Sequence, residues 1–134
     1  MQTFLPYPSF EESAKVLDRL RLGKQRVEVL TLLRVLSGER EGWQGHPCTR
    51  MWRGYEGALA SYGVAVCREW ISKGYADGTL PKISAYLSGA NPCLPHWLGG
   101  EIHLTHRLSL LNKDFGHYRR FFPERQPFSG YYWP

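Results

Sequence analysis

A stripe of large apolar side chains in the middle of the chain constrains the fold most. Its members recur at spacings of three and four residues: Trp52, Tyr55, Leu59, Tyr62, Val66 and Trp70. That spacing places them on one side of an α-helix, predicted over residues 50–73, with Thr49 as its N-cap and Gly74 at its end. No segment shows the two-residue alternation of a convincing β-strand. The chain is therefore predicted to be all-α.

Two more main helices are predicted on either side of this one. Ser9 and Glu12 form a capping-box pattern that starts a helix near Phe10. This helix runs over residues 10–36, and Gly23 inside it is expected to kink it or split it in two. A third main helix covers residues 102–112. A chain of 134 residues suits one compact domain, so residues 1–134 are predicted to form a single domain of three main helices.

The segments between and beyond these helices are predicted to be short or irregular. Residues 2–5 are expected to be extended, because Pro6 and Pro8 follow them. Short helical turns are expected at residues 83–87 and 114–121. Glycine and proline mark the long loops, and the C-terminal tail is irregular and aromatic.

Composition narrows the functional classes. The formal charge is +5 and the sequence pI is about 9.3, which raises the prospect of a polyanionic partner, nucleic acid above all. Three cysteines without a CxxC pair favour a reducing cytoplasm over a disulfide framework. The chain has no GxSxG, no P-loop and no GxGxxG pattern, so no cofactor is predicted. No apolar run approaches the length that spans a membrane.

The stretch RLRLGKQRVEVL, residues 19–30, holds one carboxylate among several cations. At 3.6 residues per turn, Arg21, Lys24 and Gln25 share a helix side with Glu28, and the same side is apolar beyond it. Glu28 is therefore expected at the edge of the core. By spacing alone, an ordinary surface ion pair between Lys24 and Glu28 is the simpler interpretation. A carboxylate placed for chemistry is the alternative.

Three other groups of residues carry open alternatives. His46 before Pro47, with Arg50 and Arg53, could bind a phosphate at a helix start or could simply cap the helix. Cys93, His96, His103 and His106 have unusual spacing for zinc, so no metal is predicted, and His103 and His106 are expected to be ordinary polar helix residues. The aromatic tail FSGYYWP could stack on bases or anchor itself to the body of the domain.

The whole chain resembles a bacterial family. The segments MQTFLPYPSFEESAKVLDRLRLGKQRVE, GHPCTRMWRGYEGAL and HRLSLLNKDFGHY carry the resemblance, which is close over nearly the whole chain. That family is grouped with the pyrimidine-dimer DNA glycosylases of the phage endonuclease V type. Similarity to the phage enzyme itself is remote: the helix order, a helix-one glutamate, a proline before helix two and an aromatic tail.

The resemblance implies a fold, an activity and a set of site residues. Phage-type members are compact all-α proteins in which a terminal α-amine attacks C1′ of the damaged nucleotide, forms a Schiff base and allows β-elimination. Their essential helix-one glutamate falls on Glu28, and basic residues around it hold kinked DNA. Where the phage pattern has a histidine, this chain has Arg21. Lys24, Gln25 and Arg26 would line the same cleft, and His46, Arg50 and Arg53 would contact the DNA.

The start of the chain departs from the phage pattern. Phage-type enzymes expose a small second residue after removal of the initiator methionine, whereas residue 2 here is Gln. Trimming disfavours a large second residue, so Met1 is expected to remain. The nucleophile would then be the Met1 α-amine, or a lysine such as Lys24. A free α-amine is a competent nucleophile because part of it is unprotonated near neutral pH.

Three hypotheses follow from the sequence. The first is a monomeric DNA-repair glycosylase and AP lyase, with Met1 and Glu28 catalytic and double-stranded damaged or abasic DNA as the substrate. The second is a non-catalytic nucleic-acid-binding module that retains the fold. The third is an enzyme on another nucleotide or small substrate that uses Glu28, Arg21 and His46. A Met1 nitrogen close to Glu28, in one open cleft, would favour the first.

Overall fold

The computed structural model describes residues 1–134 and contains seven α-helices, one 3-10 helix and no β-strand. The all-α prediction is thus confirmed. The helices are α1 (Phe10–Val16), α2 (Arg19–Leu36), α3 (Pro47–Trp52), α4 (Glu56–Ser72), α5 (Leu80–Ser84), η1 (Ala85–Leu87), α6 (Ile102–Lys113) and α7 (Phe115–Tyr118). None of them is both long and apolar enough to cross a bilayer.

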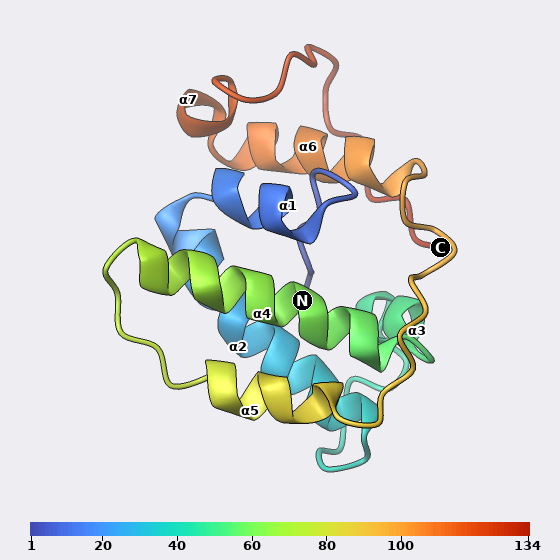
Figure 1. Cartoon of the computed structure of the whole chain (residues 1–134). Coiled ribbons are helices and arrows are strands. Elements are labelled where there is room, and N and C mark those ends of the chain that lie inside the picture. Colours follow the sequence, from blue (N-terminus) through green and yellow to red (C-terminus); the bar gives the residue numbers. More distant parts are fainter.

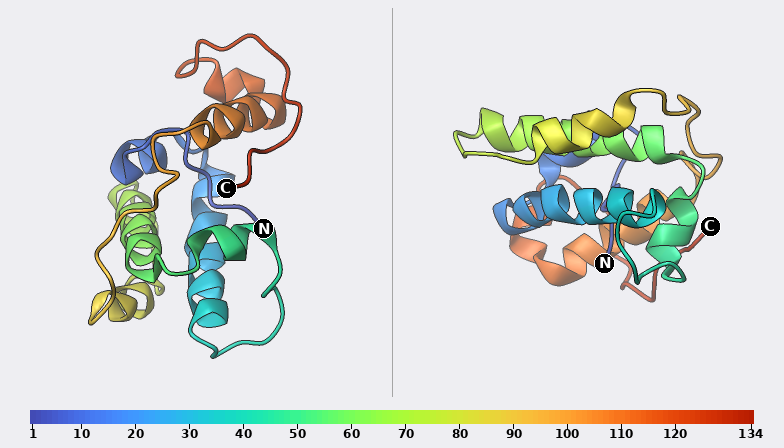
Figure 2. Two further views of the ribbon diagram at one scale, coloured as in Figure 1. Left: turned by 90° about the vertical axis from the view of Figure 1, so that its right-hand side faces the viewer. Right: turned by 90° about the horizontal axis from the view of Figure 1, so that it is seen from below.

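The two longest helices, α2 and α4, pack along each other at the centre of the fold. Helices α1 and α5 contact α4 on opposite sides (Figure 1). Seen from below, α2 lies between the α4–α5 pair and α6 (Figure 2). The close approach depends on Gly63, because a Cβ there would lie 2.6 Å from Cγ1 of Val29 and 3.0 Å from Cγ2 of Ile83. Glycine at this position lets α4 approach both α2 and α5.

The predicted helix over residues 10–36 is divided, but not at Gly23. It breaks at Leu17 and Asp18, where both residues adopt extended backbone and Asp18 becomes the N-cap of α2. The Asp18 carboxylate accepts the backbone N–H of Arg21, which supplies a local reason for a new helix start. Gly23 is helical and lies under the ring of Trp70. The predicted cap at Ser9 is confirmed, since its hydroxyl accepts the N–H of Glu12.

The predicted helix over residues 50–73 is also two helices. Its first turns belong to α3, which starts earlier, at Pro47, and is capped by the His46 side chain rather than by Thr49. Gly54 then takes a φ of +88°, a left-handed conformation that suits glycine, and α4 starts at Glu56. This break was not predicted, because the apolar stripe continues across it.

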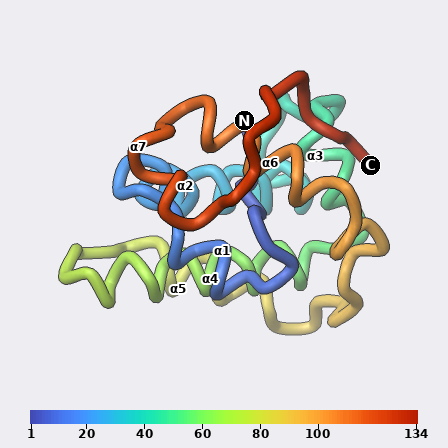
Figure 3. Tube along the Cα trace, turned by 90° about the horizontal axis from the view of Figure 1, so that it is seen from above, coloured from blue at the N-terminus to red at the C-terminus, as the bar shows by residue number.

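The first residues of the chain form an extended segment that is buried without any partner strand. Gln2, Thr3, Phe4 and Leu5 are each 7% exposed or less. Seen from above, this segment passes α6 on its way to α1 (Figure 3). Because buried backbone groups need hydrogen-bond partners, side chains of the surrounding helices must supply them. The extended conformation was predicted, whereas its burial was not.

The C-terminal part of the chain closes over α6. Helix α6 begins at Ile102 as predicted, and α7 is shorter than predicted, with Asp114 as its cap. The tail is irregular but attached: the Tyr131 hydroxyl lies 2.6 Å from Oγ of Ser109, and the Tyr132 N–H donates to Thr105 Oγ1 at 3.2 Å. These contacts favour the anchoring role for the aromatic tail.

Candidate active-site pocket

A surface pocket of about 300 Å³ lies where the N-terminal segment, α2, the end of α6 and the C-terminal tail meet. Ten residues line it: Met1, Gln2, Phe4, Leu20, Arg21, Lys24, Gln25, Glu28, Lys113 and Tyr131. Five of the predicted site residues therefore lie together: Met1 from the N-terminal segment, and Arg21, Lys24, Gln25 and Glu28 from α2. The volume is at the lower end of the range for pockets that bind small ligands.

The N-terminus and Glu28 are neighbours in this pocket. The backbone N–H of Gln2 donates to Oε2 of Glu28 at 3.2 Å. Standard backbone dimensions place the Met1 nitrogen within about 3.7 Å of the Gln2 nitrogen, and hence within about 7 Å of that carboxylate oxygen. None of the chain's ion pairs involves the Met1 amine. The Met1 amine and the Glu28 carboxylate thus lie at one pocket without forming an ion pair with each other.

Glu28 does not form the surface ion pair that the helix spacing suggested. None of the ion pairs joins it to Lys24, although Lys24 is exposed on the same side of α2. Its Oε2 instead accepts from the Gln2 N–H and from Nε2 of Gln25, the latter at 3.4 Å. Its Oε1 accepts no hydrogen bond from the protein, and the residue is partly exposed, at the edge of the core as predicted. One oxygen is held and the other is available to a ligand.

Gln25 lies in the pocket wall but is 1% exposed. Its carboxamide binds protein groups only: it accepts from the Phe4 N–H at 2.9 Å and donates to the Gln2 carbonyl at 2.8 Å. A direct hydrogen bond from Gln25 to DNA, as the family resemblance implied, does not fit this burial.

Two histidines of α6 form hydrogen bonds with the backbone of Leu5 in the N-terminal segment. The Leu5 N–H donates to Nδ1 of His106 at 2.9 Å, and Nδ1 of His103 donates to the Leu5 carbonyl at 2.8 Å. Residues three apart on a helix share one face, so the pair brackets a single residue. His103 and His106 lie in α6 as predicted, but they are 4% and 0% exposed, and this burial was not predicted. They form no metal-binding group with Cys93 and His96.

Burial controls the protonation of these histidines. Desolvation and the neighbouring His103 lower the pKa of His106 to about 3, and burial also lowers the pKa of His103. Both rings are therefore neutral at pH 7. Neutral imidazole has one acceptor and one donor nitrogen, which is what His106 needs to accept the Leu5 N–H.

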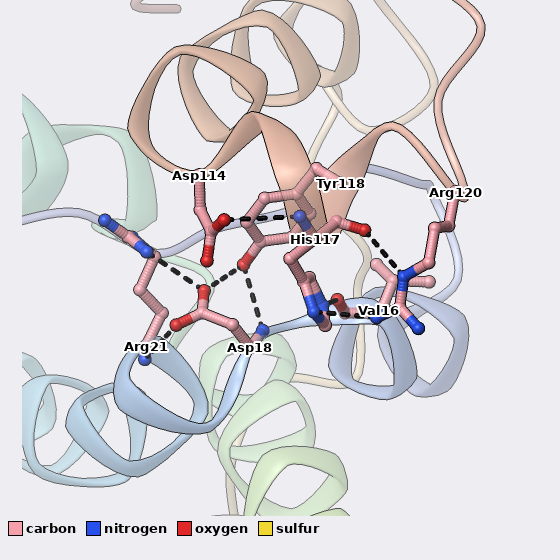
Figure 4. Close-up of polar contacts among 7 residues, drawn as sticks. All are labelled: Val16, Asp18, Arg21, Asp114, His117, Tyr118 and Arg120. Carbon is pink, nitrogen blue, oxygen red and sulfur yellow. Dashed lines mark hydrogen bonds and ion pairs between the residues drawn. The ribbon is translucent and has the colours of Figure 1, made fainter.

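A contact with the C-terminal part of the chain orients the Arg21 side chain through Asp18. Its guanidinium pairs with Oδ1 of Asp18 at 3.1 Å, and that same oxygen accepts a hydrogen bond from the hydroxyl of Tyr118 in α7 (Figure 4). The Tyr118 hydroxyl also accepts the Asp18 N–H at 3.0 Å. Burial alone would raise the pKa of Asp18, but the Tyr118 hydrogen bond and Arg21 outweigh it and lower the pKa. Arg21 is thus fixed at the pocket wall.

His46 lies near the amine but is not a free base. Its Nδ1 accepts the Cys48 N–H at 3.0 Å as the cap of α3, so in the neutral ring the proton is on Nε2. Burial and the positive charge of the Met1 amine lower the pKa of His46. Its ring meets those of Trp43 and Trp133 edge to face, at 5.4 and 6.2 Å between centroids. His46 can therefore offer an N–H donor beside the pocket.

The remaining predicted basic residues lie outside the pocket. Arg26 pairs with Asp77 at 2.5 Å and stacks on Trp70 at 4.4 Å, so it does not line the same cleft as Lys24. Arg53 is exposed and donates to Gln44, and Arg50 is exposed on α3. Arg50 and Arg53 remain available to a large ligand, whereas the Arg26 guanidinium is engaged within the protein.

Several residues of the site were missed from the sequence. Lys113 lines the pocket from the last turn of α6, and Tyr131 lines it from the tail. The aromatic run of the tail was a usable signal for Tyr131. Nothing near Lys113 marks it in the sequence, because only the packing of α6 brings it beside α2.

Thiol chemistry is disfavoured here, because burial raises the pKa of the nearby Cys48 to about 11.

Comparison with known proteins identifies the family to which the chain belongs. A family model described as pyrimidine dimer DNA glycosylase matches residues 1–81, which contain the N-terminal segment, α2 and Glu28. The pocket residues Lys113 and Tyr131 lie beyond that match. No curated protein and no solved structure matches the chain. The match covers more than half of the 134 residues, and the chain belongs to the pyrimidine dimer DNA glycosylase family.

Proposed function

We propose that this protein is a monomeric DNA-repair glycosylase with AP-lyase activity, acting on damaged pyrimidines or abasic sites through an N-terminal amine. The observation that carries the proposal is the hydrogen bond from the Gln2 N–H to Glu28, which puts the Met1 amine and a carboxylate on one pocket. A separation of up to about 7 Å leaves room for a sugar carbon between the two groups. The family match supports the glycosylase part of the proposal.

In the proposed chemistry the amine is the nucleophile, and Glu28 stabilises positive charge and accepts protons. The nitrogen lone pair attacks C1′, and the bond from C1′ to the base breaks with its electron pair leaving on the base. Opening of the sugar ring then gives an imine between the amine and C1′. Loss of a proton from C2′ expels the 3′-phosphate, which cuts the strand. Oxygen Oε1 of Glu28 stabilises the cationic C1′ and accepts protons in these steps.

Cations around the pocket suit a DNA substrate. Three cations line the pocket: Arg21 and Lys24 from α2, and Lys113 from α6. Positive side chains bind phosphates and fix the register of the duplex without reading its sequence. Access of C1′ to the amine requires a distorted or extruded nucleotide. The rings of Tyr131 and Trp43 can support the unstacked bases by stacking.

Lys24 is the competing nucleophile in the same pocket. It is exposed and has no ion-pair partner, so its ε-amine is also sterically available. The Met1 amine is favoured because its own chain is hydrogen-bonded to Glu28, whereas the Lys24 side chain is not. The experiment must therefore distinguish the two amines.

Borohydride trapping on duplex DNA with one abasic site tests the proposal. The wild-type protein should form a covalent adduct. Acetylation of the N-terminus should abolish the adduct, Lys24→Arg should retain it, and Glu28→Gln should slow it by at least about 100-fold. DNA binding without any adduct in the wild-type protein would instead indicate a non-catalytic binding module. An adduct that persists after N-terminal acetylation would overturn the role of Met1.

A further inference from the structure

We propose that Gln25 is the residue that positions the amine relative to Glu28, acting through one buried carboxamide. This inference rests on the proposed function and deepens it. Gln25 binds the residue that follows the amine and also contacts Glu28: Nε2 donates to the carbonyl of Gln2 at 2.8 Å and lies 3.4 Å from Oε2 of Glu28. Because Glu28 also accepts the Gln2 N–H, these three residues form a closed ring of hydrogen bonds.

The oxygen of the Gln25 carboxamide is also held by hydrogen bonds. Its Oε1 accepts the Phe4 N–H at 2.9 Å and lies 2.7 Å from the hydroxyl of Tyr62 in α4. That hydroxyl also lies 2.6 Å from the Phe4 carbonyl, so it shares one proton between two acceptors. A backbone N–H must meet an oxygen and a backbone carbonyl must meet an N–H, so the two ends of the amide cannot be exchanged. Gln25 therefore has one orientation.

Burial makes this arrangement costly to disturb. Gln25 is 1% exposed and Tyr62 is fully buried, so water cannot replace a lost partner. The N-terminal segment has no partner strand, and its position relative to α2 depends on side chains. Gln25 is the side chain that binds it on both sides of Thr3 while also contacting Glu28. Loss of that bridge should let the amine drift, and a drift of about 1 Å is enough to slow a reaction 100-fold.

Two substitutions of Gln25 and one of Tyr62 separate positioning from general stability. Gln25→Met keeps the size and removes all four hydrogen bonds. Gln25→Glu keeps both acceptor contacts but replaces the donor end with an oxygen that faces the Gln2 carbonyl and Glu28. Tyr62→Phe removes only the hydroxyl from the other end. Gln44→Met is the control for a glutamine outside the pocket: its carboxamide binds Val35 and Arg53 on the surface, so the comparison uses trapping rate and amplitude and not DNA affinity.

The measurement is the single-turnover rate of imine trapping at saturating abasic DNA, together with its final amplitude and the affinity for the same DNA. We expect Gln25→Met to slow the rate at least tenfold, with unchanged affinity and full amplitude for the folded protein. A merely structural role would lower the amplitude in proportion to the unfolded fraction and leave the rate unchanged. Gln44→Met should match the wild type in rate and amplitude.

The pH dependence of Gln25→Glu supplies a second, independent readout. The introduced carboxyl can donate a hydrogen bond only when protonated, so its rate relative to wild type should rise toward one as the pH falls from 8 to 5. The ratio for Gln25→Met should stay flat over the same range. If Gln25→Met does not fold, Gln25→Glu and Tyr62→Phe carry the test, and Tyr62→Phe should slow trapping severalfold.

The outcomes distinguish this inference from the proposed function. Absence of trapping by the wild-type protein overturns the proposed function. Trapping by the wild-type protein with equal rates in all the Gln25 and Tyr62 variants overturns the positioning role and leaves the proposed function standing. Slower rates in these variants, with the pH-dependent recovery of Gln25→Glu, support it.

Discussion

The backbone N–H of Gln2 donates to the Glu28 carboxylate, so the first peptide of the chain is attached to the helix that carries the proposed catalytic carboxylate. This contact joins residues 26 positions apart, and it turns an N-terminus into part of a pocket. Most chain termini are poorly ordered unless specific contacts hold them. Here side chains of Glu28, Gln25, Tyr62, His103 and His106 hold the segment in place.

Replacing His106 should change how stability depends on pH. The pKa of His106 is about 3 in the folded protein, well below the value near 6.5 of an unfolded histidine. A lowered histidine pKa means that its stabilising contribution is complete above about pH 6.5 and is lost as the pH falls toward 3. His106→Gln can still accept the Leu5 N–H through its amide oxygen but does not titrate. Its free energy of unfolding should therefore fall less steeply between pH 6.5 and 4.5.

Urea unfolding at several pH values measures that slope. The carboxylates Asp18 and Asp77 also have lowered pKa values, so their contributions are present above about pH 3.8 and are lost only below it. The window from pH 4.5 to 6.5 therefore covers the histidines with lowered pKa values, His46, His103 and His106, and the difference between the wild-type protein and His106→Gln reports His106 alone. Equal slopes for the wild-type protein and His106→Gln would show that His106 is not held neutral in the fold.

Tyr118→Phe should destabilise the fold and loosen Arg21. The substitution keeps the ring, which stacks on Phe122, but removes the donor to Asp18 and the acceptor for its N–H. Loss of a partly buried hydrogen bond to a charged group costs about 1.5–3 kcal/mol. The expected results are a lower free energy of unfolding and weaker binding to abasic DNA.

Tyr86→Phe is the matched control for that experiment. Its hydroxyl binds the exposed Glu39 on the surface, away from the pocket. The control should cost less than about 0.5 kcal/mol. Similar losses for the two variants would argue that the Tyr118 hydroxyl has no special role.

Lys113→Ala should weaken DNA binding through one lost phosphate contact. Lys113 lines the pocket opposite α2, and it forms none of the chain's ion pairs. Each neutralised phosphate adds about one unit to the slope of log affinity against log salt. The variant should therefore show a slope smaller by about 1 for every DNA sequence, in binding assays across salt concentrations. Lys82→Ala, on a different surface, should leave the slope unchanged.

The sequence predicted the helices better than their boundaries. Glu28 was placed at the core edge by the change from cationic to apolar residues along α2, and the structure confirms that position. The split of the first helix was expected at Gly23, but the local cap at Asp18 decides its place, and the break at the left-handed Gly54 was missed because the apolar stripe continues through it. Periodicity reports which side is buried, not where the backbone turns.

The site was less predictable than the fold. Lys113 reaches the pocket only through tertiary packing, and His103 and His106 looked like polar helix residues because their partner, Leu5, is about a hundred positions away. Arg26 looked equivalent to Lys24 in the basic stretch. Two positions along a helix turn a side chain by about 200°, which carries Arg26 to Asp77. Long-range pairing of this kind leaves no local pattern.

In the proposed reaction, the Met1 α-amine next to Glu28 forms the covalent intermediate. Peptide mapping by mass spectrometry after borohydride trapping on abasic DNA tests it most directly, and the intact mass of the untreated protein confirms which residue carries the free amine. We predict the sugar remnant on the α-amine of the peptide that begins at Met1. A remnant on Lys24 or any other lysine, or no adduct at all, would contradict it.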